Sequence, residues 1–440
     1  MNLRNNKSIL LQPLLLLGLL MIISCSPTKQ LKQDLHREFN TSKVFSSSFS
    51  GFAIYDPQKK KMLYSHNAEK YFVPASNMKL FTFYTAQKIL GDSVPGIMYS
   101  IKNDSLIFSG TGDPSFLNPT LPESPVFEFL KNSKKQLFYK PAVTTEEGLG
   151  PGWAWDDYNY GFSAERSQFP LFGNLVSFSF SEEGTLLKVL PERFKDSIVI
   201  PEDPEKPRVK RAKARNIFYV SERQKKDSLQ KVPFKTSSEL AIQLLADTLH
   251  RKIEILSKNY KAQSQKVLYS VPADSLYEKM LQDSDNFIAE QLLFMASKNI
   301  SDTLSSKAVI EVSKMTFLRG IPQEPRWVDG SGLSRYNLTT PKSLIFLLEK
   351  MEDEIGTDKL FQLLPAGGES GTLKNMFRSS EPYVYAKSGS MSNIYNLSGY
   401  LVTKSGKILI FSFMNNNFTG SSSVLKAEIE QILLQVRNKF

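Results

Sequence analysis

Ser76 and Lys79 form an S-x-x-K motif, in which a serine and a lysine are separated by one helical turn. On a helix these two side chains share a face, so the lysine amine can reach the serine hydroxyl. A lysine in a partly desolvated pocket has a lowered pKa and can deprotonate a serine without a histidine. The competing explanation is that Ser76 only caps a helix. The motif indicates a serine nucleophile with a lysine base, and its context has to decide between the two explanations.

The context favours Ser76 over the other S-x-x-K matches, which begin at Ser26, Ser228 and Ser423. Ser26 follows the apolar N-terminal run, Ser228 lies in a highly charged segment, and Ser423 begins the last predicted helix. Only Ser76 opens an otherwise apolar helix that follows a predicted hairpin. We therefore take Ser76 and Lys79 as the candidate nucleophile and base.

A second short motif is Ser284-Asp285-Asn286, between two helical stretches. It is one of four S-x-N matches in the chain, so it is weak evidence by itself. Ser284 or Asp285 is also a good cap for the helix that begins near Phe287. The capping role and a catalytic role are compatible.

A third motif, Lys387-Ser388-Gly389, ends a predicted strand. A lysine beside a hydroxyl on a strand edge, with a glycine that allows close backbone approach, forms a site for a carboxylate. The same three residue types recur at Lys404-Ser405-Gly406 between two apolar strand patterns, where a hairpin turn explains them better. A turn is also the alternative explanation at 387.

Histidine and cysteine chemistry is largely excluded. The three histidines, His36, His66 and His250, show no metal-ligand spacing, so neither a zinc site nor a Ser-His-Asp triad is expected. Cys25 is the only cysteine, which rules out a disulfide framework and a thiolate zinc site. We predict an enzyme without metal or cofactor.

The three motifs, in this order, resemble the active-site set of penicillin-binding proteins and serine β-lactamases. Their starting residues are 284 − 76 = 208 and 387 − 284 = 103 positions apart. The first gap is too long for a plain β-lactamase, and it implies a domain inserted after the nucleophile helix. This arrangement resembles the D-alanyl-D-alanine carboxypeptidase/endopeptidase family, the class C low-molecular-mass penicillin-binding proteins. Further matching segments are Pro74–Lys79, Gly110–Pro114, Gly152–Asp157, Asp329–Arg335 and Tyr395–Tyr400.

The resemblance covers roughly Phe49 to the C-terminus and departs from the family pattern in two places. Ser388 stands where the family usually has threonine, which keeps the hydroxyl and loses a methyl group. The part of the insert between Gly184 and Leu249 is loosely patterned, so its shape is not predicted.

The resemblance also implies roles. Ser76 would be acylated by a D-Ala-D-Ala peptide and then hydrolysed, with Lys79 as base. Ser284, held by Lys79 and Lys387, would relay the proton to the leaving amine, and Asn286 would orient Lys79 and the substrate amide. The oxyanion hole would be the backbone N–H groups of Ser76 and Ser390, a donor type worth about 10²–10³ in rate. Ser388 and Gly389 would complete the substrate site.

The resemblance further implies peptidoglycan stem peptides as substrate and β-lactam antibiotics as covalent inhibitors. The alternatives are a catalytically dead surface lipoprotein that binds wall peptides, and a β-lactamase. The sequence contains no E-x-x-L-N segment for rapid class A deacylation, which disfavours the β-lactamase. Asp156 or Asp157 is a candidate contact for the side chain of a diamino acid in the substrate.

The elements that would hold these residues are a mixed α/β set. Short strands at Ser50–Pro57 and Met62–Ser65 precede a helix at Ser76–Leu90. Patterns typical of helices and of three C-terminal strands follow: helices at Ser237–Leu249, Phe287–Ser297, Ser306–Leu318 and Pro341–Glu354, strands at Tyr383–Lys387, Asn396–Thr403 and Lys407–Met414, and a last helix at Ser422–Arg437. Pro201–Arg215 has no apolar periodicity and is predicted to be a loop or linker.

These patterns predict a catalytic domain of β-lactamase/transpeptidase type, with an antiparallel sheet flanked by helices and drawing on both ends of the chain. We expect it to comprise residues 49–92 and 266–440, with inserted domain material at 93–265. The length of 440 residues is enough for two or three domains. Hydrophobic residues make up 41% and charged residues 22%, which is ordinary for a globular protein. The net charge of +11 is spread along the chain, and we interpret it as a solvated basic surface rather than a nucleic-acid site.

The N-terminus has the pattern of an export signal. Arg4 and Lys7 precede an apolar run from Ile9 to Ile23, which is short for a membrane-spanning helix. The run ends just before Cys25, which resembles the lipidated cysteine of bacterial lipoproteins. A secretory signal with a chance cysteine is the alternative. We predict a signal peptide at 1–24, a lipid-anchored tether at 25–48, and attachment to a membrane of the bacterial cell envelope, with the catalytic domain in the periplasm.

Overall fold

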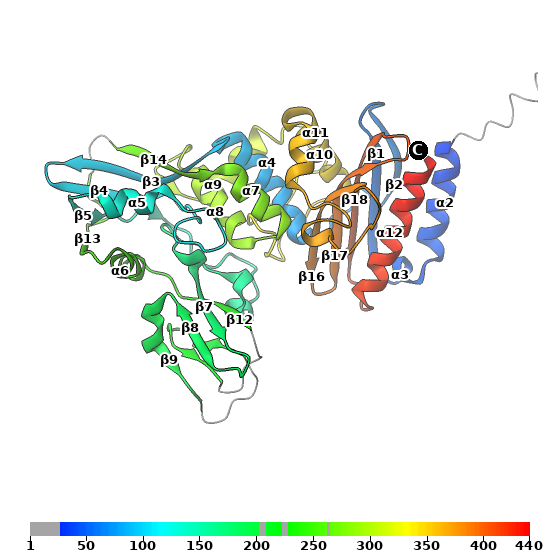
Figure 1. Cartoon of the computed structure of the whole chain (residues 1–440). Coiled ribbons are helices and arrows are strands. Elements are labelled where there is room, and N and C mark those ends of the chain that lie inside the picture. Colours follow the sequence, from blue (N-terminus) through cyan, green and yellow to red (C-terminus); the bar gives the residue numbers. More distant parts are fainter. Residues whose placement is uncertain (1–26, 202–207, 222–227, 262–264) are drawn as a thin grey trace, which may run out of the picture.

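The computed structural model describes residues 27–201, 208–221, 228–261 and 265–440. Cys25 and the predicted signal peptide lie outside the described residues. Within them, no helix combines the length and apolar character needed to cross a membrane. The described residues form two regions, each built around a β-sheet, and the helices around α4 (Met78–Leu90) lie between them (Figure 1).

A five-stranded antiparallel sheet joins the two ends of the chain. The hairpin predicted near the N-terminus pairs with the last of the three predicted C-terminal strands, Phe49 lying opposite Asn416. In spatial order the strands are β16 (Val384–Met391), β17 (Ile394–Val402), β18 (Ile408–Asn416), β1 (Phe49–Asp56) and β2 (Lys61–His66). The prediction of a mixed α/β fold with an antiparallel sheet flanked by helices is confirmed.

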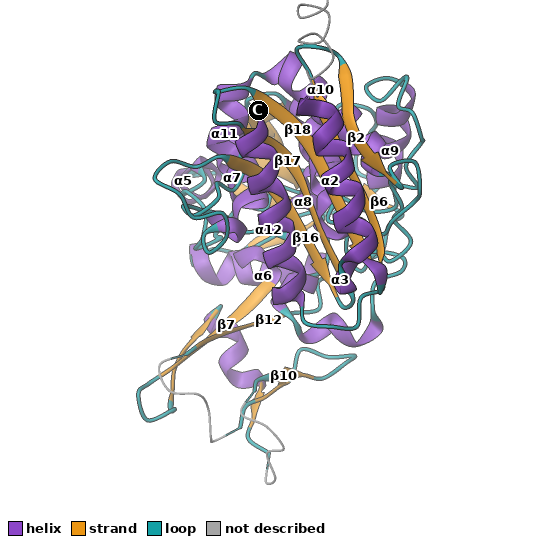
Figure 2. Cartoon of the chain, turned by 90° about the vertical axis from the view of Figure 1, so that its right-hand side faces the viewer, coloured by secondary structure: helices purple, strands orange, loops and turns teal. Residues whose placement is uncertain are grey.

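One face of this sheet is covered by helices from both termini, as Figure 2 shows with α2 and α12 in front of the strands. These are α2 (Pro27–Thr41), α3 (Lys43–Ser46) and α12 (Ser422–Lys439). Leu31, Leu35 and Phe39 recur every four residues, so they form one apolar face of α2, and all are buried. Lys439 of α12 also pairs with Asp34 of α2.

The helix α2 corrects the predicted tether. Residues 25–48 are rich in polar side chains, which suggested a flexible linker, but residues 27–46 form two helices packed on the catalytic sheet. The overall composition of this segment is polar because apolar residues occupy only every fourth position, so the apolar helix face was not predicted.

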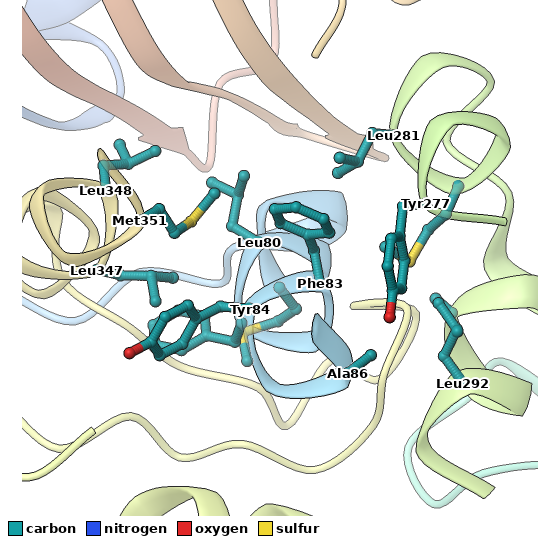
Figure 3. Packing of buried hydrophobic residues seen from close by; sticks show 14 of the residues in the cluster. Leu80, Phe83, Tyr84, Ala86, Tyr277, Leu281, Leu292, Leu347, Leu348 and Met351 are labelled. Carbon is teal, nitrogen blue, oxygen red and sulfur yellow. The ribbon is translucent and has the colours of Figure 1, made fainter. Parts of the chain in front are cut away.

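The opposite face packs against a group of helices whose centre is α4 (Met78–Leu90). Leu347, Leu348 and Met351 of α10 approach it from one side, and Tyr277 and Leu281 of α7 and Leu292 of α8 approach it from the other (Figure 3). Fully burying one such side chain is worth about 1.5–3 kcal/mol. The helices are α7 (Ala273–Gln282), α8 (Asn286–Ser297), α9 (Ser306–Met315), α10 (Pro341–Ile355) and α11 (Thr357–Leu363).

The inserted part begins at the end of α4 and contains several small sheets. The largest runs β13 (Ile253–Ile255), β5 (Gln136–Tyr139), β4 (Ser105–Gly110), β3 (Ser93–Lys102) and β14 (Lys266–Pro272), with α5 (Pro125–Asn132) and α6 (Ser238–Leu249) beside it. Because β14 pairs with β3, this sheet extends to Pro272, beyond the expected border at 265.

The smaller strands of the insert follow in two three-stranded groups and one pair. They are β12 (Leu229–Pro233), β7 (Leu175–Phe180) and β8 (Leu186–Leu190), then β10 (Lys210–Arg211), β11 (Phe218–Tyr219) and β9 (Ile198–Val199). In the pair, β6 (Val143–Thr144) of the insert lies beside β15 (Thr303–Leu304), which follows α8 in the catalytic part of the chain. The predicted loop at Pro201–Arg215 includes β10, and residues 202–207 within it lie outside the described residues.

Candidate active site

Ser76 lies in the 3-10 turn η1 (Ala75–Asn77), which leads directly into α4. Two glycines of other segments press against this turn. A Cβ atom at Gly332 would lie 1.8 Å from the carbonyl oxygen of Ala75, and one at Gly389 would lie 2.6 Å from that of Pro74. Any larger residue would therefore push the loop or the strand away from Ser76. The turn is fixed between the Asp329–Arg335 loop and β16.

Lys79 is fully buried one turn after Ser76, and its Nζ lies 2.9 Å from Ser76 Oγ. Nζ also donates to Asn286 Oδ1 at 2.6 Å and to the carbonyl oxygen of Ser331 at 2.7 Å. Both of these partners can only accept, so they use the two protons of a neutral amine. The lone pair of the neutral amine then faces the Ser76 hydroxyl, which is the geometry that a base requires.

Burial lowers the pKa of Lys79 to about 8, although the nearby carboxylates of Asp285, Asp329 and Glu290 act in the opposite direction. Desolvation penalises the ammonium form, and this effect outweighs the attraction of the three acidic groups. Lys79 is therefore neutral in a substantial fraction of molecules near pH 8.

The second motif lies at the start of α8. Asp285 caps the helix by accepting the backbone N–H of Ile288 at 2.9 Å. This is the capping role that the sequence allowed for Ser284 or Asp285. Ser284 has φ +59°, a left-handed conformation uncommon outside glycine and asparagine. Asn286, the first residue of the helix, bonds Lys79 and donates to the carbonyl oxygen of Phe162 in the insert at 3.0 Å.

The third motif lies on β16, where Lys387 is also fully buried. Lys387 Nζ donates to Ser284 Oγ and to the carbonyl oxygen of Ser388, both at 2.9 Å. Burial, reinforced by the positive charge of Lys79, holds the pKa of Lys387 well below its usual range. Ser388 Oγ donates to Thr372 Oγ1 at 2.7 Å.

The hydrogen bonding of Ser284 differs from the expectation. We expected both lysines to hold Ser284, but within the described residues its hydroxyl is bonded to Lys387 and not to Lys79. Lys79 already uses its three bonding directions on Ser76, Asn286 and Ser331. The two lysines therefore serve different serines.

These side chains surround one cavity of about 590 Å³. The lining includes Ser76, Ser284, Asn286, Ser388 and Ser390, and the two lysines lie beneath it. Its other lining residues come from the insert, the Asp329–Arg335 loop, the 3-10 turn η6 (Gly371–Leu373) and the end of β16 with the residue after it: Ala154, Asp156, Asp157, Phe162, Gly332, Leu333, Arg335, Thr372, Met391 and Ser392. The structure brings the three motifs together across 311 positions of sequence from Ser76 to Lys387, 387 − 76 = 311.

Asp329 organises the loop below the cavity, a role that the motif search missed. Its buried carboxylate accepts the N–H groups of Gly332 at 2.9 Å and Ser334 at 2.6 Å, and Trp153 of the insert donates to it at 2.8 Å. The Gly- and Ser-rich pattern around Asp329 is a sequence signal for such a tight loop. The carboxylate ties the insert to the loop whose Ser331 carbonyl holds Lys79.

Glu290 was also missed. It lies one turn after Asn286 on a helix whose residues are almost all buried, is itself fully buried, and accepts the N–H of Ser331 at 2.7 Å. Burial and the neighbouring Asp329 raise the pKa of Glu290 to about 7, opposed by Arg166, whose Nη1 lies 3.8 Å from Glu290 Oε2. A charged residue on a buried helix face is the sequence signal that could have found it.

Metal ligation has no candidate here. Within the parts of the chain that the structure describes, no group of three or more His, Cys, Asp or Glu side chains is arranged to hold a metal ion. Around Ser76 the groups available for chemistry are hydroxyls, amines and the amide of Asn286, and the carboxylates of Asp156 and Asp157 also line the cavity. This set suits acyl transfer to a serine with a lysine base.

Known proteins resemble this chain over most of its length. The sequence profile of the D-Ala-D-Ala carboxypeptidase 3 (S13) family matches residues 31–438. The D-alanyl-D-alanine carboxypeptidase DacB of Haemophilus influenzae is 25% identical over 86% of this chain and 88% of its own length. The D-alanyl-D-alanine carboxypeptidase of Actinomadura sp. strain R39 is 25% identical over 86% of this chain and 79% of its own.

Solved structures share the fold. The crystal structure of penicillin binding protein 4 from Haemophilus influenzae has a TM-score of 0.71, 22% identity, and coverage of 93% of this chain and 98% of that chain. The predatory endopeptidase Bd0816 from Bdellovibrio bacteriovorus has a TM-score of 0.51, 16% identity, and coverage of 88% and 93%.

Proposed function

The chain belongs to the D-Ala-D-Ala carboxypeptidase 3 (S13) family and is a serine-type carboxypeptidase, and we propose that its acyl-enzyme forms on Ser76. One observation carries this assignment. Ser76 Oγ lies 2.9 Å from a buried lysine whose other two hydrogen bonds go to acceptors that cannot donate.

In the proposed reaction, Ser76 Oγ attacks the carbonyl carbon of the penultimate D-Ala while its proton passes to the neutral Lys79. The C–N bond to the terminal D-Ala then breaks as Ser284 delivers its hydroxyl proton to the leaving amine. Ser284 takes up the proton that Lys79 received from Ser76, so Lys79 is neutral again. Water attacks the resulting ester, which regenerates the Ser76 hydroxyl and releases the shortened peptide. The backbone N–H groups of Ser76 and Ser390 are the proposed oxyanion donors, and Asn286 orients Lys79 and the substrate amide.

Lys387, Ser388 and Gly389 are proposed to recognise the terminal carboxylate of the substrate. Support comes from the buried lysine, which has no carboxylate among its hydrogen-bond partners in the described part of the chain, and from the close approach of β16 to the Ser76 turn. A cross-link between D-Ala and the D-centre of diaminopimelate keeps a free carboxylate at the equivalent position. We therefore propose endopeptidase activity on such cross-links as well, with Asp156 or Asp157 contacting the diamino-acid amine.

The substrate assigns the enzyme to the bacterial cell envelope, because peptidoglycan is found there. The finer proposal is that Cys25 is lipidated and holds the protein at a membrane. Its support is the apolar run and small residue that precede Cys25. Cys25→Ser should move the protein from the membrane fraction to the soluble fraction or leave an unprocessed precursor. Unchanged partition and processing of this variant would exclude the anchor.

Labelling with a fluorescent penicillin tests the nucleophile. A β-lactam mimics the acyl-D-Ala-D-Ala unit but keeps its leaving group attached, so it should trap the acyl-enzyme. The Haemophilus influenzae penicillin binding protein 4 structure has also been solved with a β-lactam, which supports this expectation. Ser76→Ala should abolish the label, and Ser423→Ala, at another S-x-x-K serine, should retain it.

The same experiment separates the alternative functions. A carboxypeptidase holds the label, a β-lactamase shows it only transiently, and a catalytically dead peptide-binding protein stays unlabelled. Label that persists on Ser76→Ala would overturn the assignment of the nucleophile.

A further inference from the structure

Aromatic side chains extend from the mouth of the cavity onto the surface of the insert. They come from the consecutive 3-10 turns η2 (Trp155–Asn159) and η3 (Gly161–Ser163) and from Tyr160 between them. Trp155 is 71% exposed, Tyr160 42% and Phe162 45%, although residues of this size are normally buried. The rings of Tyr160 and Phe162 stack with centroids 5.2 Å apart, and Phe162 also lines the cavity. The exposed aromatic surface is therefore continuous with the substrate site.

A basic segment lies along these turns and places one cation against each of three aromatic rings. The Arg208 guanidinium lies 3.9 Å from the Tyr160 ring centroid, and that of Arg211 lies 5.2 Å from Tyr158. Lys213 Nζ lies 4.7 Å from the Trp155 ring. We call these six residues the lip. A cation over an aromatic face is attracted by the ring quadrupole, so the pairs hold one another in place.

Hydrogen bonds hold the basic segment of the lip against its aromatic turn. The backbone N–H of Arg211 donates to Asn159 Oδ1 at 2.7 Å, which fastens the basic segment to η2. The buried Arg211 side chain donates to the carbonyl oxygen of Pro233 at 2.8 Å. Within the described residues, neither Arg208 nor Lys213 forms an ion pair with a carboxylate. The surface thus offers exposed rings together with positive charges that a ligand can use.

The length of the substrate indicates what reaches this surface. A stem peptide of five residues spans at most about 17 Å when fully extended. With its end at Ser76, the sugar strand that carries it must pass close to the rim of the cavity. Sugar rings pack their C–H faces against aromatic side chains, and stem peptides carry free carboxylates that arginine and lysine bind.

We propose that the lip binds peptidoglycan strands, taking sugar rings on its aromatic side chains and stem-peptide carboxylates on its cations. This inference rests on the proposed function, because it takes the cavity as the site for the stem peptide. The lip makes the enzyme more effective on the polymeric wall than on a free peptide of the same sequence.

The test compares two substrates of one enzyme. Trp155→Ala and Lys213→Glu should lower the rate of D-Ala release from purified sacculi at least fivefold. Both variants should leave kcat/KM for soluble acetylated Lys-D-Ala-D-Ala tripeptide within twofold of wild type. The matched controls are Tyr269→Ala, which removes another exposed aromatic ring, and Lys252→Glu, which reverses another exposed charge. Both controls should behave as wild type on both substrates.

Co-sedimentation with sacculi supplies a readout that needs no turnover. Penicillin-blocked wild type should still sediment with sacculi, and both lip variants should do so at least fivefold less, with the Lys213→Glu defect shrinking at high salt. Equal losses on tripeptide and sacculi, or no loss on either, would overturn the proposal. If wild type sediments through the lip but releases no D-Ala from either substrate, the proposed function fails and the binding surface stands.

Discussion

Two serine–lysine pairs border the cavity. Ser76 and Lys79 lie at the start of α4, whereas in the other pair Ser284 precedes α8 and Lys387 lies on β16. Both oxygen–nitrogen distances are 2.9 Å and both lysines are fully buried. The neighbours differ. Lys79 is surrounded by acidic groups, whereas Lys387 has a hydroxyl, a backbone carbonyl and the charge of Lys79 around it. Equal distances therefore do not mean equal chemistry.

The difference is consistent with the separate roles proposed for the two lysines. Acidic neighbours offset part of the desolvation at Lys79, so its pKa falls only to about 8 and it can exchange a proton near neutral pH. Lys387 lacks that compensation, and a substrate carboxylate would supply it. A carboxylate bound beside Lys387 would therefore raise the pKa of this lysine and stabilise its charged form.

The largest effect should come from Lys79→Arg, which keeps the charge and removes the base, because a guanidinium does not lose its proton near neutral pH. We expect kcat/KM on the tripeptide to fall by about 10²–10⁴. Stopped-flow acylation by a fluorescent penicillin measures the same step directly. Lys88→Arg, on the exposed end of the same helix, should remain active. A fully active Lys79→Arg enzyme would reverse the roles given to the two pairs.

Replacing Lys387 should change selectivity. Wild type should cleave the tripeptide acid at least tenfold faster than its C-terminal amide, because a charge-assisted hydrogen bond is worth roughly 1.5–3 kcal/mol, or one to two powers of ten in rate. Lys387→Ala and the volume-preserving Lys387→Met should both erase this preference. Wild-type kcat/KM values that are equal for acid and amide would show that Lys387 does not recognise the carboxylate.

Glu290→Gln tests the acidic surroundings of Lys79. The amide oxygen can still accept the Ser331 N–H, but the negative charge that raises the pKa of Lys79 is lost. Activity requires the neutral amine, so kcat/KM rises with pH through the Lys79 pKa. In the variant this rise should move to lower pH, by a few tenths of a unit to about one unit. Glu69→Gln, on the surface, should not move it, and an unmoved profile in Glu290→Gln would remove Glu290 from this role.

Ser388→Thr should give the smallest effect. It restores the methyl group usual in the family and keeps the hydroxyl, so kcat/KM for the tripeptide acid should stay within about threefold of wild type. Ser388→Ala, which removes the hydroxyl, should lower it further. If the threonine variant is as poor as the alanine variant, the strand wall next to Lys387 has no room for the methyl group.

The sequence predicted best those elements that have both a regular apolar pattern and a catalytic motif. The hairpin, the helix of Ser76 and Lys79 and the three C-terminal strands lie close to their expected positions, because their apolar patterns are regular. The cavity brings together the residues that the three motifs named. The roles of these residues remain predictions for the experiments above.

What the sequence concealed depends on contacts between distant segments. The apolar face of α2 is buried only because α12 and the sheet pack against it. Glu290 affects the site only because Ser331, distant in sequence, donates a hydrogen bond to it. The cations at 208–213 looked like part of a charged linker, since nothing local pairs them with Trp155, Tyr158 and Tyr160. No pattern within one segment reports such pairings.

The helix α2 also sets how far the enzyme can work from an anchor. A flexible linker of 24 residues would let the catalytic region wander over roughly 27 Å. In this chain Ser26 alone separates Cys25 from α2, which is about 22 Å long and packed on the face of the sheet away from α4. With Cys25 lipidated as proposed, the enzyme has little freedom to search. Its active site would stay at a nearly fixed distance from the membrane, so it would cleave stem peptides only in the wall layers at that distance.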